Sequence, residues 1–335
     1  MPRERVWVLD DPRAGTSAQT VGIAERLGVP FRRMRLSFNW MAHIAGLARQ
    51  GSLLGLPVPL RRTIGAELPE QEPPGIAADG PRLVISAGRR SAAVALWLKA
   101  RFGCRIVHCM SPGLGGLLRT DIFDLLVIPA HDNPPAAPNV MPVLGAPHRV
   151  SPTLLARARV AWQERLGHLP HPRIALLVGG PVRGADLAPA LAHRLGRHVA
   201  RLAAAHGGSV LATTSRRTGA EATEALAAAL GNCMHLLYRW GEPGVNPYYG
   251  YLASADVIIV TADSVSMLSE ACATEAAVHV ALPELAGRRH RRLLASLYEA
   301  GQARPLGREL ASWPRTPLDE AGRVATEILL RFKLD

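Results

Sequence analysis

Short apolar runs alternate with amphipathic stretches along this chain, a pattern typical of parallel sheets covered by helices. In the first half, the predicted strands are 6–9, 83–86, 106–109 and 125–128, and the predicted helices are 17–27 and 89–101. In the second half, the predicted strands are 174–178, 209–213, 257–260 and 278–281, and the predicted helices are about 186–206, 221–230, 264–273, 288–300 and 318–332. The two halves therefore repeat one architecture.

A proline-rich passage, residues 131–152, lies between the two halves. Proline at this density resists regular structure, so the passage is predicted to be a hinge. We expect an N-terminal domain over residues 1–150, a C-terminal domain over 151–315, and a last helix within 316–335 that packs back toward the first domain. The expected fold class is α/β, with two doubly wound (Rossmann-like) parallel-sheet domains facing a cleft. Ligands of such sheets bind at the carboxyl ends of the strands.

Length and composition are those of a globular protein. The chain has 335 residues, of which 48% are hydrophobic and 20% charged, enough to bury a core in each of two domains. No run approaches the roughly 18 apolar residues of a spanning helix, and the N-terminus has no signal-peptide pattern, so a cytoplasmic protein is expected. The 4 cysteines lack CxxC spacing, and the 12 histidines lack the partners of a metal site.

The net charge of +12 is carried almost entirely by arginine, because Lys99 and Lys333 are the only lysines. It predicts attraction to anionic partners such as nucleotide phosphates or lipid headgroups, although a coding bias toward arginine would produce the same count. Nucleic acid is not expected, since aromatic residues make up 5% of the chain and no recognition motif is found. Residues 31–62 mix apolar and aromatic side chains with arginines. That segment can lie on an anionic membrane or form a helix packed on the sheet, and we favour the helix.

The scarcity of lysine also excludes several kinds of nucleotide enzyme. No Gly-Lys-Ser/Thr sequence is present, so there is no ordinary P-loop. No tyrosine is followed four residues later by lysine, which removes the Tyr-x-x-x-Lys pair of short-chain dehydrogenases and sugar epimerases. The first strand leads into DDPRAG rather than GxGxxG, so a nicotinamide-dependent activity is not favoured.

The most informative segment is 257–273, where an apolar strand leads into a serine-rich helix. Asp263 or Ser264 can cap that helix, and the free amides of its first turn, with the positive end of the helix dipole, favour an anion such as phosphate. Ser266 and Glu270 follow on one helix face, about 6 Å apart along the axis. A diphosphate at the helix start would bring its ribose hydroxyls within reach of Glu270. A well-capped helix with a surface glutamate is the structural alternative.

Two more loops of the second half end at the same sheet edge. Gly179 and Gly180 follow the strand 174–178 and would let a ligand approach the backbone closely. Hydroxyls and guanidiniums suited to phosphate follow the strand 209–213, and these are Thr214, Ser215, Arg216 and Arg217. Trp240 or Tyr238 could cover a base. Each loop alone is consistent with a purely structural role, whereas the three together favour a nucleoside diphosphate.

Polar residues also follow the strands of the first half. The DDPRAG loop supplies Asp10, Asp11, Arg13 and Gly15, and the SAGRR loop supplies Ser86, Gly88, Arg89 and Arg90. Their glycines and arginines suit a second anion, such as the phosphate of an acceptor, or they form turns with solvated arginines. His131 closes a strand before the hinge and could act as a general base, with Asp10 or His108 as alternatives.

Several of these motifs occur together in one known family. DDPRAG, SAGRRS, FDLLVIPAHD, TTSRRT, NPYYGYLASAD and TADSVSMLSEA resemble the elongated-mitochondria (mitochondrial-fission) protein family and its bacterial relatives, over about residues 6–330. The plant branch of that family is associated with recruiting a dynamin-like protein to mitochondria. The bacterial branch often carries a sugar-epimerase label, which the missing Tyr-x-x-x-Lys pair does not support.

The second half also resembles the GT-B glycosyltransferases, in which the C-terminal domain binds the nucleotide-sugar donor. By that resemblance Glu270 would hold the ribose, and the diphosphate would lie against Gly179, Gly180, Ser264 and Ser266. The resemblance implies no bound metal and no cofactor. The glycine–histidine pairing that is usual in the lipid-linked sugar transferases is missing from the first loop.

We therefore expect a GT-B-like, metal-independent glycosyltransferase that takes a nucleotide sugar and acts on an anionic or lipid-linked acceptor of the cell envelope. Peripheral contact with the inner face of the inner membrane is part of that expectation. Donor contacts would come from the loops of the second half, and acceptor contacts from the DDPRAG and SAGRR loops. The alternatives are a non-catalytic membrane or protein adaptor and, least favoured, a nucleoside-diphosphate-sugar epimerase.

Overall fold

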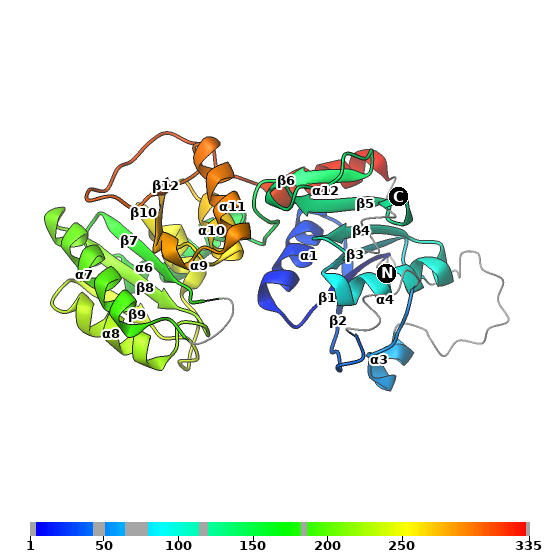
Figure 1. Ribbon diagram of the computed structural model, residues 1–335, viewed down its shortest axis with the longest axis horizontal. Coiled ribbons are helices and arrows are strands. Elements are labelled where there is room, and N and C mark those ends of the chain that lie inside the picture. Colours follow the sequence, from blue (N-terminus) through cyan, green and yellow to red (C-terminus); the bar gives the residue numbers. More distant parts are fainter. Residues whose placement is uncertain (1–4, 43–50, 64–79, 114–119, 182–185, 333–335) are drawn as a thin grey trace. The chain divides into compact units, whose positions relative to one another are not determined.

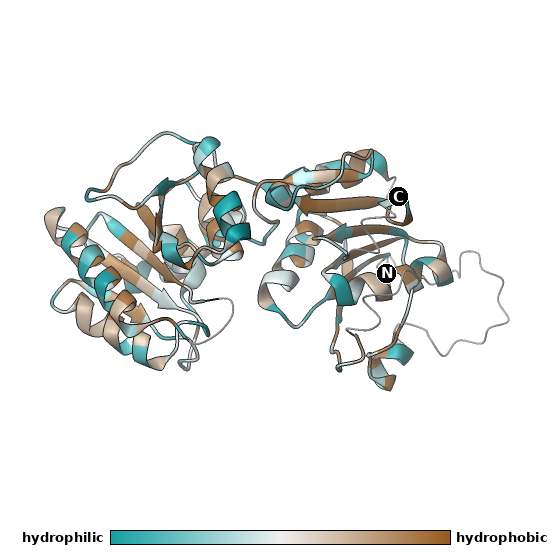
Figure 2. Cartoon of the chain, in the orientation of Figure 1, coloured by the Kyte–Doolittle hydropathy of each residue, from teal (hydrophilic) through white to brown (hydrophobic). Residues whose placement is uncertain are grey.

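The computed structural model describes residues 5–42, 51–63, 80–113, 120–181 and 186–332. The chain divides into two compact units (Figure 1). Unit 1 comprises Met1–Arg149 and Glu320–Asp335, and unit 2 comprises Val150–Asp319. The strands of both units are largely apolar, whereas many helices have one apolar and one polar side (Figure 2).

Unit 1 is built on a six-stranded parallel sheet with the strand order β2-β1-β3-β4-β5-β6. Its strands are β1 (Val6–Asp10), β2 (Phe31–Arg35), β3 (Leu83–Ala87), β4 (Arg105–Cys109), β5 (Leu125–Pro129) and β6 (Val140–Val143). Its described helices are α1 (Ala14–Leu27), α3 (Val58–Thr63), α4 (Arg89–Phe102) and α12 (Glu320–Arg331), with 3₁₀ turns at Thr120–Ile122 and Ala130–Asp132.

Helices cover both faces of this sheet, because its central strands are apolar on both sides. On one face α1 and α12 pack against the strands through Ile23, Val324 and Ile328. On the other face α4 packs through Val94 and Leu98. Residues that follow unit 2 in the sequence therefore complete the core of unit 1.

Unit 2 repeats the plan with the strand order β12-β11-β10-β7-β8-β9, again all parallel. Its strands are β7 (Arg173–Val178), β8 (Ser209–Thr214), β9 (His235–Tyr238), β10 (Val257–Thr261), β11 (Ala277–Ala281) and β12 (Arg304–Pro305). Its described helices are α6 (Pro152–Leu166), α7 (Pro189–Ala205), α8 (Ala220–Leu230), α9 (Tyr248–Ser254), α10 (Val265–Cys272) and α11 (Arg288–Glu299), with a 3₁₀ turn at Pro283–Leu285.

The unit 2 sheet is also covered on both faces. Helices α7 and α8 pack on one face through side chains such as Leu195 and Leu226. Helices α6 and α9 bring Leu166 and Tyr251 against Leu211 of β8 in a separate cluster. Both units are thus doubly wound α/β sheets, which confirms the predicted fold class.

Each sheet has one point where the strand order reverses. In unit 1 the chain runs from β1 outward to β2 and then restarts at β3 on the other side of β1. In unit 2 it runs from β7 outward through β8 and β9 and restarts at β10 on the other side of β7. The loops after neighbouring strands diverge at such a point, and the crevice between them is where ligands bind in open α/β sheets.

The prediction that residues 131–152 resist regular structure is wrong for part of that passage. Val140–Val143 forms β6, an edge strand with a single neighbouring strand. Pro142 is tolerated there because the amide hydrogen that proline lacks is not needed to bond a second strand. Helix α6 then starts at Pro152, and the Ser151 side chain accepts a hydrogen bond from the Leu154 amide (2.9 Å). Proline fits that first turn because its amide would have no partner within the helix.

The prediction of a helix within residues 31–62 is wrong for its first part. Phe31–Arg35 forms β2, the opposite edge strand, in which only Met34 is fully buried. Trp40 follows with 73% of its surface exposed, and a short helix begins at Val58. Residues 43–50 lie outside the described part of the chain. Across the described ranges, none of the helices has the length and apolar character required to cross a bilayer.

Candidate functional site

Two glycines at the unit 2 switch point contact the loop of the neighbouring strand. The Gly179 amide donates to Thr261 Oγ1 (2.8 Å), and the Gly180 amide donates to Asp263 Oδ2 (2.9 Å). A Cβ atom on Gly179 would lie 2.2 Å from the same Oδ2. The close approach that glycine permits here is therefore to a carboxylate of the chain itself. Both amides are already bonded, so a diphosphate would have to be held by other groups.

Asp263 is fully buried at this point, and Arg217 holds it. The Arg217 Nη2 atom lies 3.0 Å from Asp263 Oδ2, and Nη1 of the same guanidinium donates to the Gly180 carbonyl. The other oxygen, Asp263 Oδ1, is buried and has no hydrogen-bond partner in the described part of the protein. The charge on this buried carboxylate is thus balanced mainly by one arginine, which comes from the loop after β8.

Helix α11 adds positive charge beside this pair. Its first five residues are Arg288-Arg289-His290-Arg291-Arg292, and the four arginines are exposed. Burial is the largest cause that lowers the pKa of His290; the charge of Asp263 opposes it, and those of Arg289 and Arg217 add to it. This run was not among the predicted contacts, although RRHRR shortly after a strand is a visible signal in the sequence. A helix start that carries arginines favours anions.

The helix after β10 starts as predicted at Ser264. The Ser264 Oγ atom accepts a hydrogen bond from the Met267 amide (3.3 Å), and α10 covers Val265–Cys272. Ser266 is partly buried in the first turn. The amino end of α10 therefore lies at the carboxyl end of β10, next to the switch point.

Glu270 lies further along α10 and is buried, with 8% of its surface exposed. The Tyr248 hydroxyl, from the start of α9, donates to Glu270 Oε2 at 2.5 Å. Burial raises the pKa of the Glu270 carboxyl to about 7 from an ordinary value of 4.5, and the hydrogen bond from Tyr248 opposes part of that rise. Glu270 is therefore not the surface glutamate of the structural alternative.

The loops after β8 and β9 line a pocket of about 580 Å³. Four of its lining residues were predicted donor contacts, namely Thr214, Ser215, Arg216 and Trp240. The Thr214 hydroxyl accepts from the Trp240 amide (2.9 Å), which fixes the backbone of that loop. The indole itself is 58% exposed, and Arg216 is exposed as well. The pocket thus has a free aromatic face and a cation at its rim.

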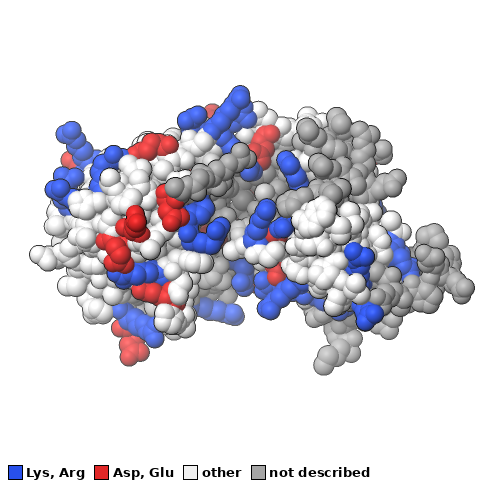
Figure 3. Space-filling view, turned by 60° about the horizontal axis from the view of Figure 1, so that its bottom comes forward, with Lys and Arg blue, Asp and Glu red and all other residues white. Residues whose placement is uncertain are grey.

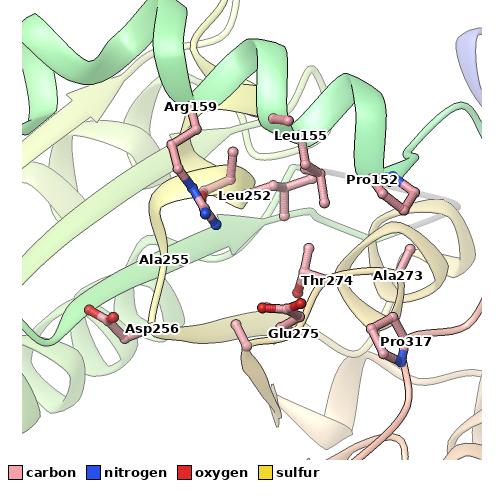
Figure 4. A pocket seen from close by; sticks show the side chains of 13 residues that line it. Pro152, Leu155, Arg159, Leu252, Ala255, Asp256, Ala273, Thr274, Glu275 and Pro317 are labelled. Carbon is pink, nitrogen blue, oxygen red and sulfur yellow. The ribbon is translucent and has the colours of Figure 1, made fainter.

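A second pocket, of about 420 Å³, lies at the other end of the strands (Figure 4). Asp256 and Ala276, which line it, immediately precede β10 and β11. Arg159 also lines it, and its Nε atom donates to the Ala253 carbonyl (2.9 Å). Because ligands of open α/β sheets bind at the carboxyl ends, this pocket is not the candidate site.

The acids of the DDPRAG loop in unit 1 are paired with arginines. Asp10 Oδ2 lies 2.7 Å from Arg33 Nε, and Arg90 Nη2 donates to both oxygens of Asp11 (3.1 and 3.0 Å). The Arg13 amide donates to Asp11 Oδ1 (2.9 Å). The Asp11–Arg90 pair joins the loop after β1 to the start of α4, which follows β3, across the unit 1 switch point, and the Asp10–Arg33 pair joins β1 to β2.

The remaining unit 1 candidates lie in different settings. Gly15 is in the first turn of α1, Gly88 precedes α4 with φ 80, and Arg89 opens that helix. Ser86 is fully buried, and its hydroxyl is 2.8 Å from Nδ1 of His108. Both are core side chains, and burial lowers the pKa of His108 to about 3. His131 is also buried, in the 3₁₀ turn after β5. His131, Ser86 and Asp10 come from different elements, namely the 3₁₀ turn after β5, strand β3 and the end of β1.

Arginine makes much of the surface basic, as the net charge of +12 leads one to expect. Figure 3 shows Lys and Arg side chains scattered over one face of the molecule, with Asp and Glu among them. Among the described residues, no group of three or more His, Cys, Asp or Glu side chains is arranged to hold a metal ion.

Two doubly wound sheets, each with a switch point edged by helix starts, are the hallmark of the GT-B-like class of proteins. The structure of a UDP-GlcNAc 2-epimerase from Methanocaldococcus jannaschii, in complex with UDP-GlcNAc and UDP, is similar at a TM-score of 0.51 and 12% identity. The similarity covers 98% of this chain and 99% of that one. Within that class, the sequence matches the family described as Mitochondrial fission ELM1 over residues 14–332, and the chain belongs to that family.

Two relatives show how the family extends. The mitochondrial fission protein ELM1 of Arabidopsis thaliana is 30% identical over 281 residues, which cover 75% of this chain but only 64% of that protein. An uncharacterized protein of Rickettsia prowazekii is 24% identical over an alignment of 373 positions, gaps included. That alignment covers 98% of this chain and 99% of that protein. The predicted family is thereby confirmed.

Proposed function

We propose that unit 2 binds a nucleoside diphosphate sugar and that the protein is a glycosyltransferase. The observation that carries this proposal is the placement of α10. Its amino end lies at the β7–β10 switch point, and Glu270 follows on the same helix as a buried carboxyl group. Helix-start amides with nearby arginines suit a diphosphate, and a carboxylate suits ribose hydroxyls.

Glycosyl transfer needs positive charge near the departing group. The acceptor oxygen forms a bond to the anomeric carbon while the bond from that carbon to the diphosphate breaks, and the proton of the acceptor passes to a base. Negative charge therefore grows on the leaving diphosphate. The amino ends of α10 and α11, together with Arg217, would offset part of that charge.

The pocket after β8 and β9 and the fold neighbour both support the proposal. Trp240 offers an exposed ring for a base, and Arg216 offers a cation at the rim of the same pocket. The neighbour of known structure was solved with UDP-GlcNAc and UDP, although at 12% identity that relation concerns the fold. An anionic or lipid-linked acceptor fits the excess of arginine.

A second candidate function is a non-catalytic adaptor for a membrane or a protein. One observation favours it: the groups best suited to a nucleotide are bonded within the chain. Gly179 and Gly180 donate to Thr261 and Asp263, and Tyr248 donates to Glu270. An adaptor that kept the fold would have no need of a free donor site.

Calorimetric titration with UDP, GDP, ADP and CMP separates the two candidates. A transferase binds at least one of these nucleotides, and an adaptor binds none. Replacing Glu270→Ala should weaken binding by about 1–3 kcal/mol, because a ribose hydroxyl would lose its acceptor. The matched control is Glu275→Ala, since Glu275 is an exposed acid at the opposite end of the sheet. Equal affinities for the wild type and Glu270→Ala would contradict the ribose role.

A further inference from the structure

Glu270 is engaged by a residue that lies 22 positions away in the sequence. The Tyr248 hydroxyl donates to Oε2 at 2.5 Å, a short distance typical of a hydrogen bond to a charged acceptor. The Tyr248 hydroxyl thus fixes the orientation of the Glu270 carboxylate.

Tyr248 is itself held in place by its neighbours. Its amide donates to Asn246 Oδ1 (3.0 Å), and its ring packs edge to face on that of Tyr249, with the ring centroids 5.6 Å apart. Three residues further along α9, the Tyr251 ring packs edge to face on Trp162 of α6, with centroids 6.4 Å apart. The phenol is therefore fixed by its own loop and by the packing of α9 on α6.

We propose that Tyr248 is a positioning residue, whose hydroxyl fixes Oε2 of Glu270 and so orients the carboxylate toward the ribose hydroxyls of a bound nucleotide. This inference rests on the nucleotide binding proposed above. Each carboxylate oxygen can accept two hydrogen bonds, so the Tyr248 contact leaves acceptor sites on Glu270 for the ribose. Recognition of the ribose should therefore depend on the Tyr248 hydroxyl as well as on Glu270.

The same hydrogen bond also affects the pKa of Glu270. A hydrogen bond to the charged form of a carboxyl lowers its pKa, and Tyr248 has that effect on Glu270 against the larger effect of burial. In the described part of unit 2, Tyr248 is the titratable side chain that forms a hydrogen bond with this carboxyl, and the Tyr249 ring packs on that of Tyr248. His290, Asp263 and Arg217 form the other charged group at this sheet edge.

The first experiment measures the affinities of UDP and ADP for the wild type, Tyr248→Phe and Tyr251→Phe by calorimetry. Tyr248→Phe should lose roughly 3–10-fold in affinity for the nucleotide that binds, because the Glu270 carboxylate is no longer held in place, and Tyr251→Phe should lose less than about twofold. Equal affinities for the wild type and Tyr248→Phe would overturn the role of Tyr248 in ribose binding. If neither UDP nor ADP binds, the proposed function fails for these nucleotides, and the ribose part of the inference fails with it.

The second experiment needs no nucleotide and tests the positioning role separately. The Glu270 carboxyl carbon is followed by NMR as a function of pH in the wild type and in Tyr248→Phe. The titration midpoint of Glu270 should rise by about one pH unit in the variant, because the charged form loses a hydrogen bond. Tyr251→Phe changes a tyrosine of the same helix that packs on Trp162, and it should leave the midpoint unchanged. An unchanged midpoint in Tyr248→Phe overturns the positioning role, whatever the nucleotide result.

Discussion

The acids at the two switch points are held in different ways. In unit 1, Asp10 pairs with Arg33 and Asp11 pairs with Arg90, so two acids meet two arginines. In unit 2, Asp263 is paired with Arg217, and the arginine-rich start of α11 stands beside them. The two acids of the unit 1 edge thus form two ion pairs with arginines of neighbouring elements, whereas in unit 2 one buried pair lies beside the four exposed arginines that open α11.

The comparison teaches which edge is suited to an anion. Exposed arginines at a helix start favour an anion such as phosphate. Helix α11 begins with four of them, whereas the starts of α1 and α4 carry one exposed arginine each, Arg13 and Arg89. The difference agrees with placing the donor site on unit 2, and the predictions that follow test it.

The largest expected effect comes from removing the arginine of the buried pair. Arg217→Ala should lower the free energy of unfolding of unit 2 by about 4 kcal/mol, because it leaves the Asp263 carboxylate buried and uncompensated. Arg33→Ala in unit 1 should cost less, about 2 kcal/mol, because the Arg33 side chain is 39% exposed, so that solvent screens the pair, and the Asp10 side chain keeps 7% of its surface in solvent. Urea denaturation of both variants measures the contrast.

The control for this prediction is the double variant Arg217→Ala/Asp263→Asn. It removes the orphaned charge and should recover part of the lost stability. Similar losses for Arg217→Ala and Arg33→Ala would mean that the two edges do not differ in the way described.

The second effect is an opposite response of the two units to pH. The Glu270 pKa of about 7 lies above its ordinary value of 4.5, so its contribution to stability is complete below pH 4.5 and is lost as the pH rises through 7. Glu270→Gln should remove this loss, which amounts to about 3 kcal/mol. In unit 1, the His108 pKa of about 3 lies below the ordinary 6.5, so its contribution is complete above pH 6.5 and is lost as the pH falls toward 3.

Hydrogen exchange followed by mass spectrometry can report each unit separately. At pH 8.5 relative to pH 5.5, protection should fall in unit 2 of the wild type and stay level in unit 2 of Glu270→Gln. Parallel behaviour of the wild type and the variant would show that the Glu270 carboxyl does not titrate in this range.

The smallest effect concerns the exposed aromatic side chain of the unit 2 pocket. Trp240→Ala should change stability by less than about 0.5 kcal/mol, because the indole is 58% exposed. The same change should weaken nucleotide binding by about 1–2 kcal/mol if a base stacks on the ring. Trp40→Ala in unit 1, where the side chain is also exposed, is the matched control and should leave nucleotide affinity unaltered. A loss shared by both variants would argue against stacking on Trp240.

The central strands could be predicted from the sequence because burial on both faces makes them continuous apolar runs. The runs at Leu83–Ala87 and Val257–Thr261 are examples, each buried at every position. The edge strands could not. Phe31–Arg35 contains three arginines, and Val140–Val143 contains a proline, since an edge strand has only one neighbour and a partly exposed face.

The candidate site divides along the same line. Ser264 and Glu270 could be located because a helix start after a buried strand is a local pattern. The partners of Asp263 and Glu270 could not be predicted, because Arg217 and Tyr248 come from other loops and contact them only in the folded chain. The close contact between Gly179 and the Asp263 carboxylate could not be predicted from the sequence for the same reason.

Helix α12 has a consequence for how the protein is made. Val324 and Ile328 fill the core of unit 1, yet the ribosome synthesises them only after all of unit 2. The segment up to Arg149 must therefore wait with an apolar face of its sheet incompletely covered, while the later-made unit can close its own cores first. Nascent chains halted before Glu320 should accordingly hold a protease-resistant second unit and a first unit still open to cleavage.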